Sequence, residues 1–432
     1  MTTSLPHRTG EVALTLLGPD DRPLADRAVT VAQTRHAFAF GNIGFDFVDL
    51  VGGPTPEGVD GDFGDAPGGL DLDRLGELWL NLFNTATLPF YWGGYEPRRG
   101  RPDAERLTRT ARWFAERGVT VKGHPLVWHT VQPPWLLELA RTEGLDEVER
   151  LQRARIRDLA GGFAGLVDTW DAINEAVIMP VFANGDNAVT RLARARGRIH
   201  MVRMAFEEAR AANPAATLVL NDFDLSSAYE CLIEGVLEAG VRIDAIGLQT
   251  HMHQGYRGEE YTRDVLDRFA RYGLPLHLTE TTLVSGHLMP PEIEDLNDYQ
   301  IPEWPSTPEG EARQADDVAR HYRTLFAHPA VQAVNYWGLT DQGAWLGAPA
   351  GLVRSDGTRK PSYDALEGLI KGEWWLPPTG MRTGPDGTLT VRGFHGDYTV
   401  DGAPFNIAPG RTTRTVRTSD AGPPAAGPIV IG

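Results

Sequence analysis

Cysteine, basic residues and long apolar runs are all scarce in this sequence of 432 residues. The single cysteine, Cys231, excludes an internal disulfide and any metal site built from several cysteines. No run of 18 apolar residues occurs, so a transmembrane helix is not expected. Only 41 Lys and Arg stand against 58 Asp and Glu, which gives a formal charge of −17. Because nucleic acids and anionic membranes bind basic surfaces, we expect neither as a partner.

The first ten residues, MTTSLPHRTG, lack the apolar segment of a secretion signal. An initiator Met followed by polar residues favours the cytoplasm, and a secreted protein whose leader has been removed is the alternative. Cys231 lies in an apolar helical stretch, CLIEGVLEAG, and is expected to be a buried, inert thiol.

Three regions of the chain differ in their hydrophobic pattern. Residues 1–35 contain two alternating apolar stretches separated by GPDDRPLAD, a pattern that predicts a β-hairpin. Residues 36–371 alternate short apolar runs with Ala-, Leu- and Glu-rich helical stretches, which predicts a parallel sheet with crossover helices. Residues 372–432 return to a β pattern and end in a Pro/Gly-rich tail.

The middle region contains eight strand–helix units, and this number predicts a (β/α)8 TIM barrel. A doubly wound open sheet is the competing architecture, but no G-x-G-x-x-G follows the first strand, so a dinucleotide fold loses its main support. We expect the two terminal β-segments to form a small accessory module that is structural rather than carbohydrate-binding, since they carry no aromatic platform. The predicted strands begin at His36, Leu82, Val119, Leu166, Thr217, Asp244, Leu274 and Val331.

Polar and aromatic side chains gather where the predicted barrel strands end, at the edge where barrels carry active sites. Strands four and seven contribute the carboxylates Glu175 and Glu280. Cleavage of a glycosidic bond with retention needs two carboxyls, one to protonate the leaving oxygen and one to attack the anomeric carbon. Tryptophan faces stack on sugar rings, and His and Gln position hydroxyls. The other residues at these ends are His124, Trp128, His129, Asn174, Asn221, Asp222, Gln249, His251, His253, Trp337, Asp341 and Trp345.

Five ordered segments within residues 36–370 resemble the family 10 glycoside hydrolases, the endo-1,4-β-xylanases. They are KGHPLVWH, WDAINEAV, GLQTHMH, LHLTETT and NYWGLTDQGAWL. The resemblance implies a TIM-barrel enzyme that cleaves β-1,4-xylosidic bonds in xylan or xylo-oligosaccharides by double displacement. It implies no metal and no cofactor.

The same resemblance assigns roles to individual residues. Glu175 matches the general acid/base, Glu280 the nucleophile, and His251 the histidine that hydrogen-bonds the nucleophile. The positions implied to bind the sugar at the cleavage point are Asn174, Gln249 and His124, and those implied to form its aromatic walls are Trp128, Trp337 and Trp345. Lys122 precedes His124 as in the family, but we expect it outside the site.

One stretch departs from the family pattern. After the second strand, family members carry a Glu-Asn pair and then a Lys before a Trp, which hold the distal sugar on the non-reducing side. Here the stretch reads TLPFYWGGYEP: residues 88–91 replace the polar groups and the loop is shortened, while Trp92 and Glu96-Pro97 remain. Hydrolysis is therefore better supported than the substrate.

Other functions compete with this interpretation. The altered loop suits an intracellular β-glycosidase for short oligosaccharides or aglycone-bearing glycosides, and a catalytically inactive carbohydrate-binding barrel is a further alternative. Four histidines, His124, His129, His251 and His253, could hold a metal, but hydrogen-bonded or packing histidines are favoured. The long loop at residues 285–310 is expected to lie beside the nucleophile as a lid.

Overall fold

A computed structural model describes residues 5–54 and 70–418 of the chain. These residues divide into two compact units, one of residues 39–365 and one that combines residues up to 38 with residues from 366 onward. The predicted tail at residues 419–432 lies outside the described residues.

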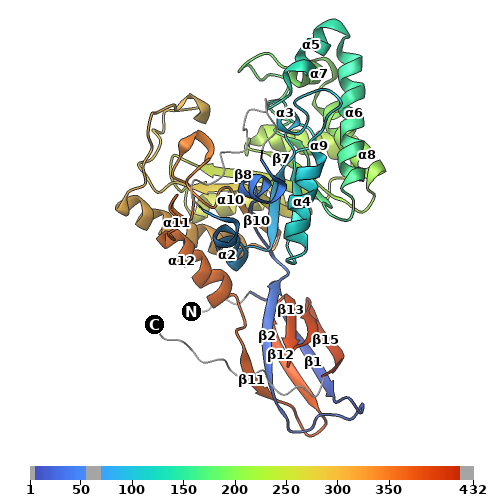
Figure 1. Ribbon diagram of the computed structural model, residues 1–432, viewed down its shortest axis with the longest axis vertical. Helices are drawn as coiled ribbons and strands as arrows, with labels where there is room; N and C mark the ends of the chain where they lie inside the picture. The colour runs from blue at the N-terminus through green and yellow to red at the C-terminus, as the bar shows by residue number, and fades with distance from the viewer. Residues whose placement is uncertain (1–4, 55–69, 419–432) are drawn as a thin grey trace. The chain divides into compact units, whose positions relative to one another are not determined.

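The larger unit is a closed barrel of eight parallel strands, which confirms the predicted fold class (Figure 1). Strand β10 closes the barrel by pairing with both β3 and β9. Each strand begins within a few residues of the position predicted from the sequence, because every apolar run is one barrel strand. The strands are β3 (Ala39–Ile43), β4 (Thr85–Pro89), β5 (Thr120–His124), β6 (Thr169–Asn174), β7 (Thr217–Asp222), β8 (Ala245–Met252), β9 (Leu276–Leu283) and β10 (Val331–Tyr336).

Helices follow the strands and cover the outside of the barrel. Their starts are specified locally: in α11 the Thr307 hydroxyl accepts from the Gly310 N–H at 3.0 Å, and Pro308 occupies the first turn. No helix within the described residues is both long and apolar enough to cross a membrane. The helices are α1 (Asp46–Gly52), α2 (Leu72–Leu82), α3 (Trp92–Tyr95), α4 (Ala104–Ala115), α5 (Pro134–Thr142), α6 (Leu145–Gly162), α7 (Ala188–Arg196), α8 (Arg198–Ala212), α9 (Ser227–Glu238), α10 (Glu259–Ala270), α11 (Pro308–Ala327) and α12 (Pro361–Glu367).

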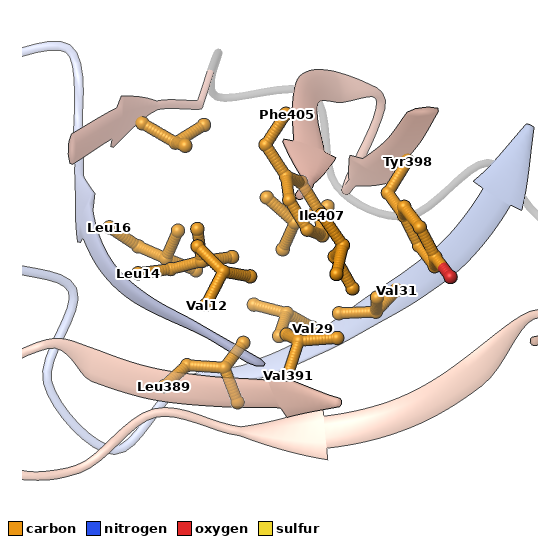
Figure 2. Close-up of a cluster of buried hydrophobic side chains, with 12 residues drawn as sticks. Val12, Leu14, Leu16, Val29, Val31, Leu389, Val391, Tyr398, Phe405 and Ile407 are labelled. Atoms are coloured by element: carbon orange, nitrogen blue, oxygen red, sulfur yellow. The ribbon is translucent and has the colours of Figure 1, made fainter. Parts of the chain in front are cut away.

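The smaller unit is a β-sandwich made from both ends of the chain. One sheet has the order β12-β1-β15 and the other β11-β2-β13-β14. Aliphatic and aromatic side chains from the two sheets form its core (Figure 2). Its strands are β1 (Thr9–Leu17), β2 (Ala28–His36), β11 (Thr379–Arg382), β12 (Thr388–Phe394), β13 (Gly396–Val400), β14 (Ala403–Ile407) and β15 (Gly410–Arg417).

The predicted hairpin between the two N-terminal strands is wrong in its pairing. Strands β1 and β2 lie in different sheets, and C-terminal strands take the neighbouring positions in each. The alternation does identify the buried residues of both strands, since Val12, Leu14 and Val31 are fully buried. Alternation identifies the buried face of a strand but does not identify its partner.

Cys231 is exposed on α9, so the prediction of a buried thiol is also wrong. Helix α9 buries Tyr229, Leu232, Ile233 and Val236. Cys231 falls on the opposite face, because a helix buries only one stripe of an apolar segment.

The loop after β9 carries a small apolar core of its own. Trp304 and Met289 are buried there against Val284, Ala348 and Ala350. The Trp304 indole N–H also donates to the His287 carbonyl oxygen at 2.9 Å. The loop is therefore a packed structure, and its movement as a lid stays a prediction.

Candidate active site

A cavity of about 1250 Å³ opens at the carboxyl ends of the barrel strands. All nine residues that the sequence assigned to the site line this cavity. They come from β5, β6, β8, β9 and the segments that follow them and β10: His124, Trp128, Asn174, Glu175, Gln249, His251, Glu280, Trp337 and Trp345.

Glu175 directly follows β6 in a backbone conformation that its residue type rarely adopts. Its φ is +55°, in the left-handed region, and its N–H donates to the Asn221 carbonyl oxygen at 2.8 Å. The carboxyl group accepts from the Trp128 indole N–H at 2.8 Å and from the Asn174 amide at 3.1 Å. Strained backbone of this kind persists where surrounding contacts impose it. Here those contacts aim the carboxyl into the cavity.

Glu175 keeps its proton to an unusually high pH. Burial raises the pKa of its carboxyl to about 8, and the negative charges of Glu280 and Asp222 add to the effect. The hydrogen bond from Trp128 works in the opposite direction, because it stabilises the ionised form. A carboxyl that is protonated near neutral pH can serve as a general acid.

Glu280 lies within β9 and is held from two sides. Its Oε1 accepts from the Asn221 amide at 3.0 Å, and its Oε2 hydrogen-bonds His251 Nε2 at 3.0 Å. The other ring nitrogen of His251 contacts the Thr282 hydroxyl at 3.1 Å. These contacts fix the orientation of the carboxyl group, as a nucleophile requires.

A chain of amides connects the two carboxyl groups. The Asn221 amide donates to both Glu280 and the Asn174 side-chain oxygen, the latter at 2.7 Å. Gln249 donates to the same Asn174 oxygen at 3.0 Å. Asn221 was recognised at a strand end but received no role, although its place beside the other polar strand ends was a usable signal.

The His124 ring is held in place by the buried carboxylate of Asp171. Its Nδ1 lies 2.7 Å from Asp171 Oδ2, and Lys122 Nζ lies 2.7 Å from the same oxygen. Burial opposes the charge of Asp171, but Lys122 and His124 outweigh it and lower the pKa of this carboxyl. His124 Nε2 is thereby placed 4.0 Å from Glu280 Oε1. Lys122 does not line the cavity, as expected.

Aromatic rings surround the carboxyl pair. Trp337 packs edge-on against His124, with centroids 5.2 Å apart, and Trp345 lies 5.0 Å from His251 with 37% of its surface exposed. Phe45 and Tyr91 also line the cavity, and the sequence had not assigned them. Tyr91 could have been identified, because it stands in the stretch that departs from the family pattern.

His129 and His253 are packed among aromatic rings. His129 lies 4.4 Å from the Phe182 ring and His253 5.2 Å from the Trp345 ring. Burial lowers the pKa of His129 to about 4. Burial and the charge of His251 lower that of His253 to about 3. Within residues 5–54 and 70–418, no group of three His, Cys, Asp or Glu side chains is arranged to hold a metal ion.

Comparisons with known proteins identify the family and the fold. The model of glycosyl hydrolase family 10 matches residues 85–368. An endo-1,4-β-xylanase B of Thermotoga neapolitana is 28% identical over 70% of this chain and 84% of its own length. The anti-sigma-I factor RsgI6 of Acetivibrio thermocellus is 26% identical over 72% of this chain but only 36% of its own.

A solved structure shows the same fold. Xylanase 10B of Thermotoga petrophila, crystallised with xylobiose, superposes with a TM-score of 0.59. The match covers 78% of this chain and 94% of that one at 24% identity.

Proposed function

The chain belongs to glycosyl hydrolase family 10, and from this premise we propose that it hydrolyses β-1,4-linked xylo-oligosaccharides or xylan with retention of anomeric configuration. The observation that carries the proposal is the contrast between the two carboxyl groups. Glu175 is largely buried and holds its proton to a pH of about 8, whereas Glu280 is anchored by Asn221 and His251.

This contrast assigns the two chemical steps. In the first, a Glu280 oxygen attacks the anomeric carbon while Glu175 gives its proton to the departing glycosidic oxygen, so a glycosyl ester forms as the glycosidic bond breaks. In the second, Glu175 takes a proton from water, and the resulting hydroxide displaces Glu280 from the anomeric carbon. Two inversions give net retention.

The polar network serves both steps. The charge on Glu280 disappears when the ester forms, and Glu175 is left ionised, ready to act as a base. Asn174 and Trp128 donate to Glu175 and so stabilise that ionised state. Trp337 and Trp345 offer ring faces and edges along the cavity for the sugar.

Azide rescue tests the assignment directly. On 4-nitrophenyl β-xyloside, whose leaving group departs without an acid, Glu175→Ala should still form the glycosyl ester, and azide should accelerate its breakdown to a β-glycosyl azide. Glu280→Ala lacks the nucleophile, so azide should instead attack directly and give the α-glycosyl azide. Identical azide products from the two variants, or near-normal turnover by Glu280→Ala without azide, would contradict the proposal.

A further inference from the structure

The stretch that departs from the family pattern presents one side chain to the cavity. Phe90 is fully buried behind the wall, with its ring 4.8 Å from that of Trp170 and 5.0 Å from that of Phe163. Tyr91, the next residue, lines the cavity at the start of α3. The end of the cavity next to this stretch therefore begins at an aromatic ring.

Tyr91 belongs to a closed set of four rings, which we call the aromatic box: Phe45, Tyr91, His124 and Trp337. Going round the box, the centroid distances are 6.1, 5.4, 5.2 and 5.6 Å, and all four contacts are edge-to-face. Rings at these distances are in contact. No sugar ring fits between neighbours in the box, so its members form a continuous wall.

Asp46 lies next to this wall, at the start of α1, and lines the same cavity. Within residues 5–54 and 70–418, the Asp46 carboxyl group forms no hydrogen bond and no ion pair. Asp49, one turn along, is different, because it contacts the Arg106 guanidinium. Burial, aided by the charge of Asp49, raises the pKa of Asp46 to about 7. A half-buried carboxyl without a protein partner is stabilised when a ligand hydroxyl supplies one.

The opposite side of the cavity is open and more exposed. Phe223 after β7 and Tyr261 on α10 line it with 45% and 38% of their surfaces exposed. Gln254 and Arg257, from the segment after β8, line the same side. Among the described residues, the lining on this side of the carboxyl pair is exposed, whereas on the other side it consists of the rings of the aromatic box, which are in contact with one another.

We propose that the aromatic box ends the cavity behind a single sugar, and that Asp46 binds a hydroxyl of that sugar. The enzyme then removes one sugar at a time from the non-reducing end of its substrate, rather than cleaving inside the chain. This inference rests on the proposed hydrolase function and adds where the substrate is cut. Glu175 protonates the oxygen between the terminal sugar and the next, and the rest of the substrate leaves through the open side.

Two chromogenic substrates test the inference with the 432-residue chain. On 4-nitrophenyl β-xylobioside we expect xylose first, with nitrophenol following after a lag, because the terminal sugar must leave before the aryl bond reaches Glu175. The xyloside should release nitrophenol without a lag. Xylobiose and nitrophenol released together from the xylobioside would overturn the inference while leaving the hydrolase function intact. No cleavage of either compound, or of the matching glucoside and cellobioside, would overturn both.

Variants of Asp46 test the binding residue. Asp46→Ala should raise KM for the xyloside about tenfold with a smaller change in kcat, because one hydrogen bond to the sugar is lost. Asp46→Asn should recover part of the loss, since an amide still bonds a hydroxyl. Asp73→Asn is the matched control: Asp73 is exposed in the first turn of α2 and does not line the cavity, so its substitution should leave KM within about twofold. An unchanged KM in Asp46→Ala would overturn this role.

A variant that gains the ability to release xylobiose tests whether the aromatic box closes the cavity. Tyr91→Ala removes one ring of the box and should allow some xylobiose to be released from the xylobioside. The measured quantity is the ratio of xylobiose to xylose among the first products, which is independent of how much folded enzyme is present. An unchanged ratio would show that Tyr91 does not close the cavity.

Discussion

The β-sandwich and the carboxyl end of the barrel bury opposite kinds of side chain. The cluster at the centre of the sandwich is aliphatic and aromatic, and its Tyr398 hydroxyl donates to the Phe394 carbonyl oxygen at 2.7 Å. The barrel buries Asn174, Asn221, Gln249 and Glu280 at one end. Buried polar groups need partners and stabilise a fold less than apolar ones do. At that end, the barrel therefore gives up stability in exchange for chemistry.

The largest expected effect is on activity alone. Glu280→Ala should lower kcat by roughly 10⁴-fold or more, because the glycosyl ester cannot form. Its melting temperature should change little, because the cost of leaving Asn221 and His251 without this acceptor is offset by the removal of a buried carboxyl group. Parallel rate measurements and thermal melts check this. A variant that melts far below the wild type would mean that Glu280 also holds the barrel together.

Glu175→Gln should lower activity while it raises stability, a clearer separation of the two than Glu280→Ala offers. Loss of the acid lowers kcat on xylo-oligosaccharides by about 10² to 10⁴-fold. Folding raises the pKa of Glu175 from 4.5 in the unfolded chain to about 8. The carboxyl group therefore destabilises the fold increasingly as the pH rises from 4.5 toward 8, because the folded state resists its ionisation. The variant should therefore be more stable than wild type at pH 7, by roughly 1–3 kcal/mol, and equal to it near pH 4.

Urea unfolding at both pH values measures this difference. A glutamine variant less stable than wild type at pH 7 would show that the carboxyl contributes to the fold, and the comparison between barrel and sandwich would lose its main support.

A substitution in the sandwich core should lower stability and leave activity unchanged, the reverse of the effect expected in the barrel. Leu14→Ala deletes a fully buried side chain and should cost the sandwich about 2–5 kcal/mol, with kcat of the barrel unchanged. Thr15→Ala, the next residue on β1, points away from the core and is the matched control. Differential scanning calorimetry shows whether the sandwich has an unfolding transition of its own and whether the substitution lowers the temperature of that transition. A parallel fall in kcat would mean that the two units do not act independently.

The smallest expected effect is a shift in pH dependence. kcat/KM should fall as pH rises through the pKa of Glu175, near 8, because the general acid loses its proton. Trp128→Phe removes a hydrogen bond that favours the ionised carboxyl, so the fall should move to higher pH by about one unit. A pH–rate profile of both proteins measures this. If the fall in kcat/KM moved to lower pH instead, Trp128 would affect the pKa of Glu175 chiefly through the packing of its ring and not through its hydrogen bond.

The barrel and its site were predictable because both depend on short segments of sequence: apolar runs predict the strands, and the polar residues at their ends predict the site. Each apolar run is one strand, and polar residues at strand ends meet at one edge of any parallel barrel. Glu175 and Glu280, about a hundred residues apart in the sequence, could thus be placed in one cavity without knowledge of distances.

Pairing and ring contacts were not predictable. The partner of β1 depends on which strand reaches it, and the strand that does so in parallel, β15, comes some 400 residues later in the chain. The aromatic box joins Phe45, Tyr91, His124 and Trp337 from four strand ends, and nothing local in the sequence indicates that their rings touch. The indole hydrogen bond of Trp128 to Glu175 depends on side-chain orientation in the same way.

The place of β1 between β12 and β15 also bears on how the protein is made. At about 5–20 residues per second, a ribosome needs tens of seconds to add the strands that pair with β1. Until then the apolar face formed by Val12, Leu14 and Leu16 has no permanent cover, while the barrel is already being synthesised. A circular permutant that begins with β3 and carries all seven sandwich strands consecutively at its end would shorten that exposure, and should aggregate less during rapid expression.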